Sequence, residues 1–311
     1  MEGERHFVGV DGGGTRSRAV VGDAEGRELG RAEGGPGLIL ASDPGVAVRS
    51  VAEVVREAAA EARVSLPLEA LWAGLAGAGN ERARARAEAG LAESGVARRV
   101  TVGSDVTAAH AAAFGDGPGV VLVAGTGCAL RAVEPGGRTI RVGGWGALLG
   151  DEFGGYGIAL AALRAVLGAA DGREAPTALA DLFGEAAGCS DAHSLAAWGE
   201  RAAKHEIAAL AGRVGRLGLG GDLVAAKVVA AALEEVRSHL AAALARTSGW
   251  TSPLPVALVG GLIRPGGPLR EAVAQAVEEM GCAVHPGEVV PERGALLLAR
   301  GTLGGYGQES P

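Results

Sequence analysis

The segment VGVDGGGTRSRAVV, residues 8–21, carries three glycines and a threonine at the point where two strand-like runs meet. Its apolar, β-branched flanks predict two strands joined by a glycine turn. Consecutive backbone N–H groups in such a turn can form a concave nest for anions, and glycine lets a ligand approach the main chain closely. Gly12, Gly13, Gly14 and Thr15 are therefore candidate phosphate-binding residues. A plain hairpin turn is the alternative interpretation.

Asp11 stands directly before this turn, where a carboxylate would repel a phosphate unless a cation lay between them. Mg²⁺ binds through one or two carboxylates, waters and the phosphates themselves, so we expect Asp11 to hold a hydrated Mg²⁺ ion. Other nucleotide-binding signatures are absent. The sequence has no GxxxxGK[ST] loop, and its two lysines, Lys204 and Lys227, lie in helix-like segments rather than on the strand that protein kinases require.

A second strand–turn–strand pattern occurs at GVVLVAGTGCALRAVE, residues 119–134. Its AGTG turn contains Thr126 and Gly127, which could bind phosphate in the same way as the first turn. We interpret the two patterns as an internal repeat of architecture rather than of sequence identity. Two such turns, one in each half of the chain, favour phosphate binding over two unrelated hairpins.

Asp105 lies at the end of the strand-like run RVTVGSD, where a helix-like segment begins. Sheets of α/β proteins expose ligand-binding groups at such strand ends. A carboxylate in this place can accept the proton of an alcohol during phosphoryl transfer. The competing interpretation is that Asp105 caps the helix that follows it.

The elements that must position these groups follow from periodicity and turn residues. Strands are expected at residues 7–10, 17–22, 27–33, 70–77, 99–105 and 136–144, and as the pair within 119–134; helices are expected at 43–63, 81–95, 222–247 and 293–301. Residues 153–247 are mainly helical, and 254–281 predicts a strand, a Gly-Gly turn and a helix. The sum is an α/β fold whose two halves each begin with antiparallel strands around a glycine turn.

The bulk composition narrows the class of protein. A length of 311 residues favours two domains, and 48% hydrophobic residues suffice for substantial cores. A net charge of −7 argues against a general nucleic-acid binder. No signal-peptide pattern and no apolar run of ~20 residues occurs, so we expect a cytoplasmic protein without a membrane partner. Three widely spaced cysteines favour free thiols over a zinc site or disulfides.

Five motifs in order carry a resemblance to a known family: VGVDGGGTRSRAVV, SDVTAAHAAA, VLVAGTGCALRAV, GGWGALLGDEFGGYGIA and ALVGGLIRPGGP. Together they resemble the N-acetylglucosamine kinase group of the BadF/BadG/BcrA/BcrD ATPases, in the sugar kinase, Hsp70 and actin superfamily. The resemblance implies two ribonuclease H-like (actin-like ATPase) domains around an ATP cleft. The domains would span residues 1–115 and 116–290, the second with a helical insertion, and a helix at about 290–303 would pack back on the first.

The resemblance also implies roles for particular residues. DGGGT and AGTG are similar to the family's two phosphate motifs, and VGGLI would place Gly260 and Gly261 under the adenosine of ATP. Asp105 would be the catalytic base and would contact the sugar. The activity implied is ATP-dependent phosphorylation, with Mg²⁺, of a hydroxyl of an amino sugar such as N-acetylglucosamine or glucosamine, the 6-hydroxyl being favoured.

The motif GGWG…GDE would supply the remaining contacts to the sugar. Asp151 and backbone groups near Gly144 would orient the ring, although Asp151 is also in place to cap the following helix. Trp145 is either a platform for the sugar face or an anchor in the core.

The sequence departs from the family pattern at the sugar. Leu38 stands where relatives often carry an asparagine that binds sugar hydroxyls, and a lost hydrogen bond can penalise a substrate heavily. Cys128 replaces a serine of the second phosphate motif, and residues 73–80 lack a serine seen in some relatives. Glucosamine, N-acetylmuramate or a plain hexose therefore stay open beside N-acetylglucosamine.

Two other functions within the superfamily stay open. An ATP-driven activator of a dehydratase needs cysteines at a dimer interface for an iron–sulfur cluster, and the cysteines here form no such motif. A non-catalytic sugar sensor would bind without turnover; a repressor would need a DNA-binding domain before the first strand, for which residues 1–6 leave no room. Family analogy suggests a homodimer.

Overall fold

The computed structural model describes residues 4–301. Within that range the chain forms two compact units. The first unit comprises residues 4–119 and 289–301, and the second unit comprises residues 120–288. Each unit is built on a five-stranded sheet flanked by helices.

The sheet of the first unit begins with an antiparallel meander. Its strands are β1 (Phe7–Gly12), β2 (Ser17–Gly22), β3 (Glu28–Gly34), β4 (Leu68–Leu75) and β5 (Ala97–Gly103). The strand order is β3-β2-β1-β4-β5, with β4 parallel to β1 and β5 parallel to β4. The carboxyl ends of β1, β4 and β5 therefore meet at one edge of the sheet, where α/β proteins place their ligand-binding groups.

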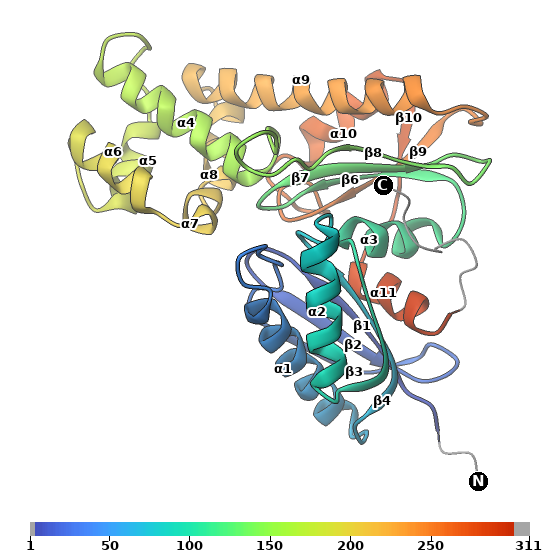
Figure 1. Cartoon of the computed structure of the whole chain (residues 1–311). Coiled ribbons are helices and arrows are strands. Elements are labelled where there is room, and N and C mark those ends of the chain that lie inside the picture. Colours follow the sequence, from blue (N-terminus) through green and yellow to red (C-terminus); the bar gives the residue numbers. More distant parts are fainter. Residues whose placement is uncertain (1–3, 302–311) are drawn as a thin grey trace. The chain divides into compact units, whose positions relative to one another are not determined.

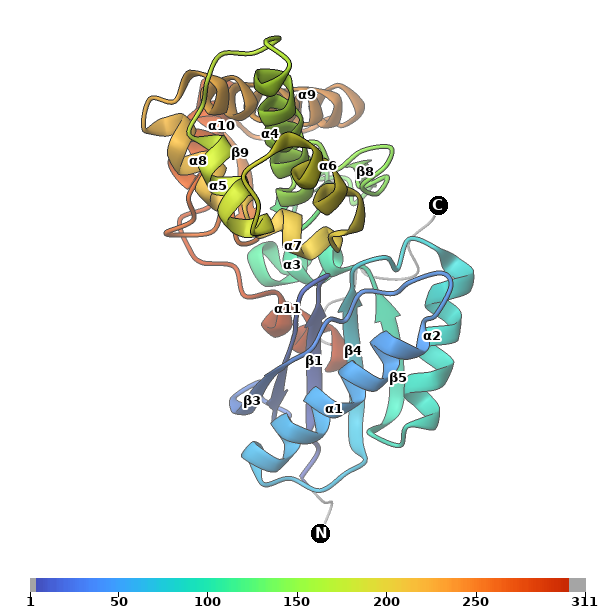
Figure 2. The same ribbon diagram turned by 90° about the vertical axis from the view of Figure 1, so that its left-hand side faces the viewer.

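Helices cover both faces of this sheet, as Figure 2 shows. One face carries α1 (Gly45–Ala62) and α2 (Glu81–Glu93); the other carries α3 (Asp105–Phe114) and α11 (Pro291–Ala299). The period of two along β1 explains the two layers. Val8 and Val10 belong to the apolar cluster under α1 and α2, whereas Phe7 belongs to the cluster under α3 and α11.

Two glycines let α11 approach its neighbours closely. A Cβ at Gly9 of β1 would lie 2.1 Å from the backbone nitrogen of Leu296, and one at Gly294 would lie 2.0 Å from the carbonyl oxygen of Ala108 in α3. No side chain larger than hydrogen fits at either place. The helix is thus pressed against both β1 and α3, although it comes from the far end of the chain.

The sheet of the second unit repeats the plan of the first. Its strands are β6 (Gly119–Ala124), β7 (Cys128–Val133), β8 (Thr139–Gly143), β9 (Leu254–Val259) and β10 (Cys282–Val284). The order β10-β9-β6-β7-β8 equals that of the first sheet, with β9 parallel to β6 and β10 parallel to β9. The predicted α/β fold and its internal repeat are confirmed, while β10 lay outside the predicted elements.

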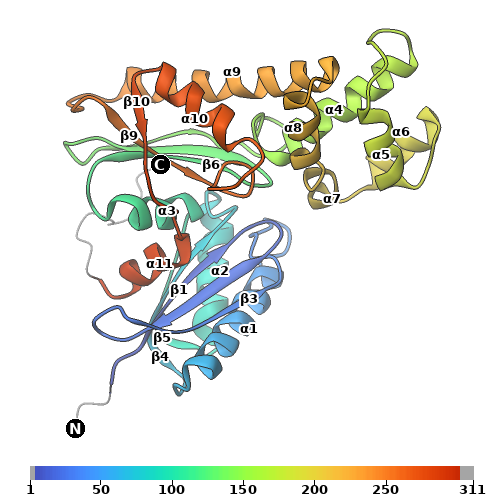
Figure 3. The same cartoon turned by 180° about the vertical axis from the view of Figure 1, so that it is seen from behind.

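Seven helices within the described part of the second unit complete its fold (Figures 1 and 3). They are α4 (Gly155–Ala170), α5 (Leu179–Ala187), α6 (Ala192–Arg201), α7 (Lys204–Ala208), α8 (Ala211–Leu219), α9 (Leu223–Arg246) and α10 (Arg270–Glu279). The long α9 begins at the cap residue Asp222, whose carboxylate accepts hydrogen bonds from the amides of Val224 and Ala225. Its buried stripe packs on β7 and β8, and α4 and α8 pack along it.

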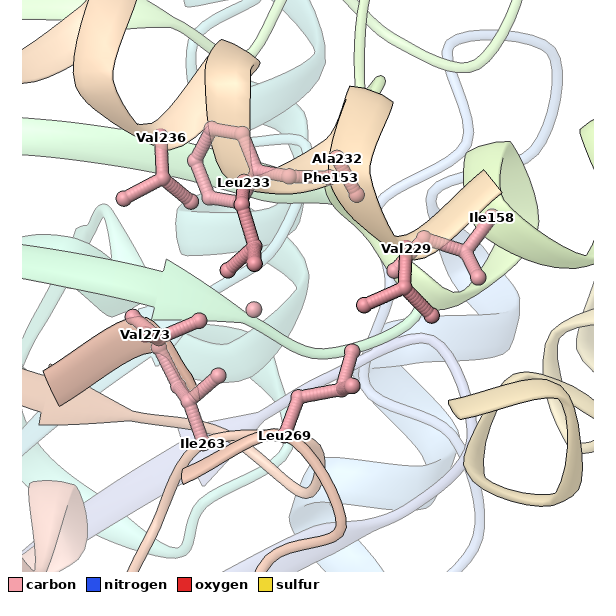
Figure 4. A pocket seen from close by; sticks show the side chains of 10 residues that line it. Phe153, Ile158, Val229, Ala232, Leu233, Val236, Ile263, Leu269 and Val273 are labelled. Atoms are coloured by element: carbon pink, nitrogen blue, oxygen red, sulfur yellow. The ribbon is translucent and has the colours of Figure 1, made fainter. Parts of the chain in front are cut away.

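The interior of the second unit contains a small apolar gap, shown in Figure 4. Its volume is about 10 Å³, and side chains such as Phe153, Val236 and Ile263 line it. That volume is about one water molecule, in a setting that offers water no polar partner. The gap is a packing defect and has no room for a nucleotide or a sugar.

Within residues 4–301, every helix is too short or too polar to cross a membrane.

The three cysteines are free thiols, as predicted, with Cys128 and Cys282 buried and Cys189 partly buried. Helix α1 starts one residue later than Pro44, which occupies the N-cap position, so Asp43 precedes the cap and accepts a hydrogen bond from the Gly45 amide.

Candidate functional site

The DGGGT segment forms the tip of the β1–β2 hairpin. Asp11 lies on β1 opposite Arg18 of β2 and Gly74 of β4. Gly13 closes the turn by donating its amide hydrogen bond to the carbonyl of Arg16 at 2.9 Å. Gly12, Gly13, Gly14 and Thr15 therefore lie together at the sheet edge where β1 ends.

Some of the motif glycines are not required by the fold. Gly13, Gly125 and Gly261 all have a backbone conformation open to other residues, because none has a positive φ. A Cβ at Gly13 would come no closer than 3.6 Å to another group, and one at Gly125 or Gly261 would meet nothing within 4 Å. Packing within their own units therefore does not require glycine at any of these three positions. Close approach of a ligand to the main chain would account for glycine at these positions.

Asp105 begins α3 directly after β5. Ser104 is the N-cap residue of this helix, so the interpretation of Asp105 as the cap was wrong. The Asp105 Oδ1 atom accepts hydrogen bonds from the Val106 amide at 2.9 Å and from the Ser104 hydroxyl at 3.2 Å. A Cβ on Gly74 of β4 would lie 3.3 Å from the Asp105 Cα, so α3 starts directly over the strand beside β1. The carboxylate is partly exposed at the same sheet edge as Asp11.

Asp11 is held in an environment that disfavours its charge. Burial, followed by the negative charges of Asp105 and Glu292, raises the pKa of Asp11 from 3.8 to about 7; Arg18 and Arg16 oppose this rise. A divalent cation beside Asp11 would remove the penalty, since an opposite charge favours the ionised form.

The donor set fits Mg²⁺ only in part. The described residues include no group of three or more histidine, cysteine, aspartate or glutamate side chains placed to hold a metal ion. Carboxylate oxygens are nevertheless the ligands that Mg²⁺ takes from proteins, and it draws its other ligands from waters and phosphates. The residues therefore fit an ion that arrives with a nucleotide better than one held by the protein alone.

Glu292 lies near Asp11 at the candidate site, and no pattern in the sequence pointed to it. It lies in the first turn of α11, is 3% exposed, and its Oε2 atom has no hydrogen-bond partner within the described residues. Its charge acts on Asp11. An acid in the first turn of a helix is common because it interacts favourably with the helix dipole, so the sequence alone gave no reason to assign Glu292 to a site. Burial of that acid appears only once α11 packs against β1.

The second glycine turn is bound to the start of α4. The Gly155 amide donates to the Gly125 carbonyl at 2.8 Å, and the Tyr156 amide donates to the Thr126 carbonyl at 2.9 Å. A Cβ at Gly154 would lie 2.6 Å from the carbonyl carbon of Gly127. Thr126 and Gly127 thus lie against the segment that carries the GDE motif.

Asp151 lies on this turn. Its Oδ1 atom accepts a hydrogen bond from the Cys128 amide at 3.1 Å, and its φ of 63° is unusual for a residue other than glycine. Burial is the largest influence on its pKa and raises it. The N-cap of α4 is Gly154, so the interpretation of Asp151 as the cap was wrong.

Gly144 and Trp145 lie in the loop between β8 and α4, which also carries Asp151. Gly144 has a φ of 70°, and its carbonyl accepts a hydrogen bond from Arg141 Nη2 at 2.7 Å. Trp145 is 78% exposed, so the interpretation as a core anchor was wrong. Leu148 and Leu149, at 91% and 77%, are exposed beside it in the sequence. The loop presents large apolar side chains to its surroundings, as a sugar-binding platform would.

Gly260 and Gly261 follow β9, next to the end of β6. Gly260 has a φ of 105°, and a Cβ there would lie 2.3 Å from the Ala124 carbonyl oxygen, so the fold itself requires glycine. The Leu262 amide donates to the same oxygen at 3.3 Å. The VGGLI segment and the AGTG turn therefore meet at one end of the second sheet, with Gly261 open to a ligand.

The departures from the family pattern have different consequences. The Cys128 side chain is buried in the core of the second unit, where burial raises the pKa of the thiol, so it leaves the turn's open side unchanged. Leu38 is half-buried next to the end of β4: a Cβ on Gly77 would lie 3.3 Å from its Cδ1 atom. An apolar side chain thus stands near the carboxyl edge of the first sheet.

The structure therefore brings the candidate residues together in two sets. Asp11, the first glycine turn and Asp105 share one edge of the first sheet, with Glu292 beside them. Within the second unit, Thr126, Gly127, Asp151, Gly260 and Gly261 gather at the end of β6, and Gly144 and Trp145 lie in the loop that leads to Asp151.

Comparison with known proteins identifies the family. The N-acetylmuramic acid/N-acetylglucosamine kinase of Clostridium acetobutylicum is 26% identical over 262 residues, 83% of this chain and 86% of that protein. The glucosamine kinase of Vibrio cholerae is 28% identical over 239 residues, 76% of this chain and 80% of that protein. A solved structure from Chromobacterium violaceum, described as a candidate N-acetylglucosamine kinase, has a TM-score of 0.80 at 27% identity and covers 95% of this chain and 99% of that one. Residues 8–299 match the BadF/BadG/BcrA/BcrD ATPase family, which confirms the resemblance, and the chain belongs to that family.

Proposed function

We propose that this protein is an ATP-dependent kinase that transfers a phosphoryl group to a hydroxyl of an amino sugar. The observation that carries the proposal is the pairing of open glycines with a carboxylate at a strand end. The main chain is accessible at Gly13, Gly125 and Gly261, although neither packing nor backbone conformation requires glycine there. Asp105, near Asp11, offers a carboxylate that can accept a proton. Relatives named as kinases of N-acetylglucosamine, N-acetylmuramic acid and glucosamine support the substrate class.

In the proposed mechanism backbone amides of the glycine turns bind phosphate oxygens of ATP. Mg²⁺, when bound near Asp11, would neutralise charge on these phosphates. Asp105 accepts the proton of the sugar hydroxyl as that oxygen attacks the γ-phosphorus, and ADP leaves. The Val106 amide and the Ser104 hydroxyl hold the Asp105 carboxylate in one orientation. We propose the 6-hydroxyl as the acceptor, since the primary alcohol is the least hindered hydroxyl of a hexosamine.

Besides the contact of Asp105 with the reacting hydroxyl, contacts to the sugar are proposed for residues of the second unit. Trp145 would lie against the apolar face of the ring, because its indole is 78% exposed and an aromatic face can pack on a sugar ring. Asp151 and the backbone near Gly144 would bind ring hydroxyls. Leu38 offers no hydrogen bond to a sugar hydroxyl, so the proposal leaves open which amino sugar is the substrate.

The test is a coupled ADP-release assay with Mg·ATP and glucosamine, N-acetylglucosamine, N-acetylmuramate, N-acetylmannosamine, glucose and mannose. The Asp105→Asn variant should lose about 10²- to 10⁴-fold in kcat, the usual contribution of a general base. Asp116→Asn is the matched control, since Asp116 is exposed after the same helix and should leave kcat unchanged. Binding of ATP without turnover of any sugar would refute the kinase and favour a sensor.

The activator alternative is disfavoured by the cysteines. Cys128 and Cys282 are buried in the core of the second unit, and only Cys189 is partly accessible. A cluster shared between two subunits needs accessible thiolates at the interface, and burial raises the pKa of both core thiols.

A further inference from the structure

We propose that the Asp151 carboxylate occupies, in the nucleotide-free protein, an amide of the second glycine turn that a phosphate takes when nucleotide binds. Asp151 would then be a positioning residue that must leave the turn before ATP is held there. This inference rests on the proposed function, because it takes ATP as the ligand of the turn.

The contact itself is specific. Oδ1 of Asp151 lies 3.1 Å from the Cys128 nitrogen, the first amide after the AGTG turn. The carboxylate also covers Gly127: a Cβ on that glycine would lie 2.7 Å from Oδ2 and 2.9 Å from the carboxyl carbon. The side chain therefore lies directly on the surface that the absent Cβ leaves open, which is the surface that a phosphate oxygen would need.

The backbone directs the side chain to this place. Asp151 adopts a φ of 63°, a region that aspartate, asparagine and glycine reach more readily than other residues. Its carbonyl accepts a hydrogen bond from the Gly154 amide at 3.0 Å, which fixes the residue relative to the start of α4. Because α4 is in turn bound to the carbonyls of Gly125 and Thr126, the loop and the turn form one connected segment.

The chemistry makes the carboxylate a competitor of phosphate. Backbone N–H groups bind carboxylate and phosphate oxygens in the same way, and two anions on one turn repel each other. The carboxylate is also incompletely compensated where it lies. Burial is the largest influence and raises the pKa of Asp151; the hydrogen bond from the Cys128 amide lowers it, Glu152 raises it, and Arg141 and Lys204 lower it, so that the pKa remains above its ordinary value. A phosphate that arrives with its own cation can therefore displace it.

Displacement would release Asp151 at the moment ATP is bound. The freed carboxylate belongs to the same loop as Gly144 and Trp145, for which we propose sugar contacts. Nucleotide binding would thus supply a hydroxyl-binding group to the sugar, and the two substrates would bind with positive coupling.

The experiment measures the affinity of Mg·ADP and of a non-hydrolysable Mg·ATP analogue by calorimetry, without sugar. Asp151→Asn removes the competing charge, and Asp151→Gly removes the carboxylate while suiting the positive φ. Both should bind nucleotide about tenfold more tightly than the wild type, the worth of one released charged hydrogen bond. The matched control Glu152→Gln removes the neighbouring charge and should change the affinity less than about twofold.

A second readout follows the amide directly. Selective ¹⁵N labelling of cysteine gives signals from the three cysteines of the chain, and the Cys128 amide should shift on adding Mg·ADP and in Asp151→Asn. Unchanged or weaker nucleotide binding in both Asp151 variants would overturn the inference and leave the kinase proposal intact. A wild type that binds no nucleotide would overturn both.

Discussion

Replacing Asp11 by asparagine should stabilise the metal-free protein above neutral pH. The folded protein must hold the Asp11 carboxylate where its pKa is about 7 instead of 3.8. The folded state therefore binds a proton more tightly than the unfolded chain does. The free energy of unfolding consequently falls as the pH rises from about 4 to about 7, and it levels off above that range. Asp11→Asn removes this pH dependence, because the amide does not ionise.

The magnitude follows from the pKa. Each pH unit between the two values is worth about 1.4 kcal/mol, so the carboxylate costs the folded state about 4 kcal/mol at pH 8. The same relation gives about 1.7 kcal/mol at pH 5, where the unfolded chain is already ionised and the folded protein is not. The stabilisation by Asp11→Asn should thus be greater at pH 8 than at pH 5 by about 2.5 kcal/mol.

The assay is urea-induced unfolding at both pH values in a chelating buffer. Trp72 is the buried tryptophan of the first unit, and its fluorescence reports on that unit when the other three tryptophans are replaced by phenylalanine. Asp116→Asn is the control, because this exposed acid in the same unit should change both stabilities alike. An equal effect of Asp11→Asn at the two pH values would refute the electrostatic account of the site.

Three further predictions test separate parts of the site. Glu292→Gln removes one of the charges that raise the Asp11 pKa, so the fall in unfolding free energy with rising pH should end at a lower pH. Urea titrations at several pH values measure this fall. The same pH range in the variant and the wild type would contradict the placement of Glu292 near Asp11. Gly261→Ala should raise the KM for ATP about tenfold or more and leave the unfolding free energy within ~0.5 kcal/mol of the wild type. Gly260→Ala should instead lower the unfolding free energy by more than ~2 kcal/mol, because φ is 105° there and a Cβ would lie 2.3 Å from a carbonyl oxygen. Trp145→Ala should raise the sugar KM about tenfold and leave the melting temperature unchanged, because the indole is 78% exposed; a fall in melting temperature with an unaltered KM would instead indicate a packing role.

Local signals predicted the parts of the site that depend on neighbouring residues. The apolar alternation around DGGGT is sufficient to predict the β1–β2 hairpin, and the strand end before Asp105 is visible in VTVGSD. The same kind of signal predicted the AGTG hairpin, and the repeat followed from comparing the two. Strand β10 was not predicted because it has only three residues and is defined by its pairing with β9.

Features that depend on distant residues could not be predicted. A tryptophan among glycines has the same composition whether it is buried or exposed, so only the structure distinguishes the two for Trp145. The burial of Glu292 arises from contact between α11 and β1, which are more than 270 residues apart. The bond between Asp151 and the Cys128 amide likewise depends on a backbone conformation that no pattern in GDEFGG specifies.

The position of α11 has a consequence for how the protein is made. This helix covers Phe7, Val20 and Trp72 in the first unit, yet the ribosome synthesises it only after residues 120–288 of the second unit. Because synthesis proceeds at about 5–20 residues per second, one face of the first sheet lacks α11 for on the order of ten seconds or more. Nascent chains of this protein should therefore be clients of chaperones that recognise exposed apolar strands, and a release of translation before α11 should yield a product that aggregates rather than a stable half.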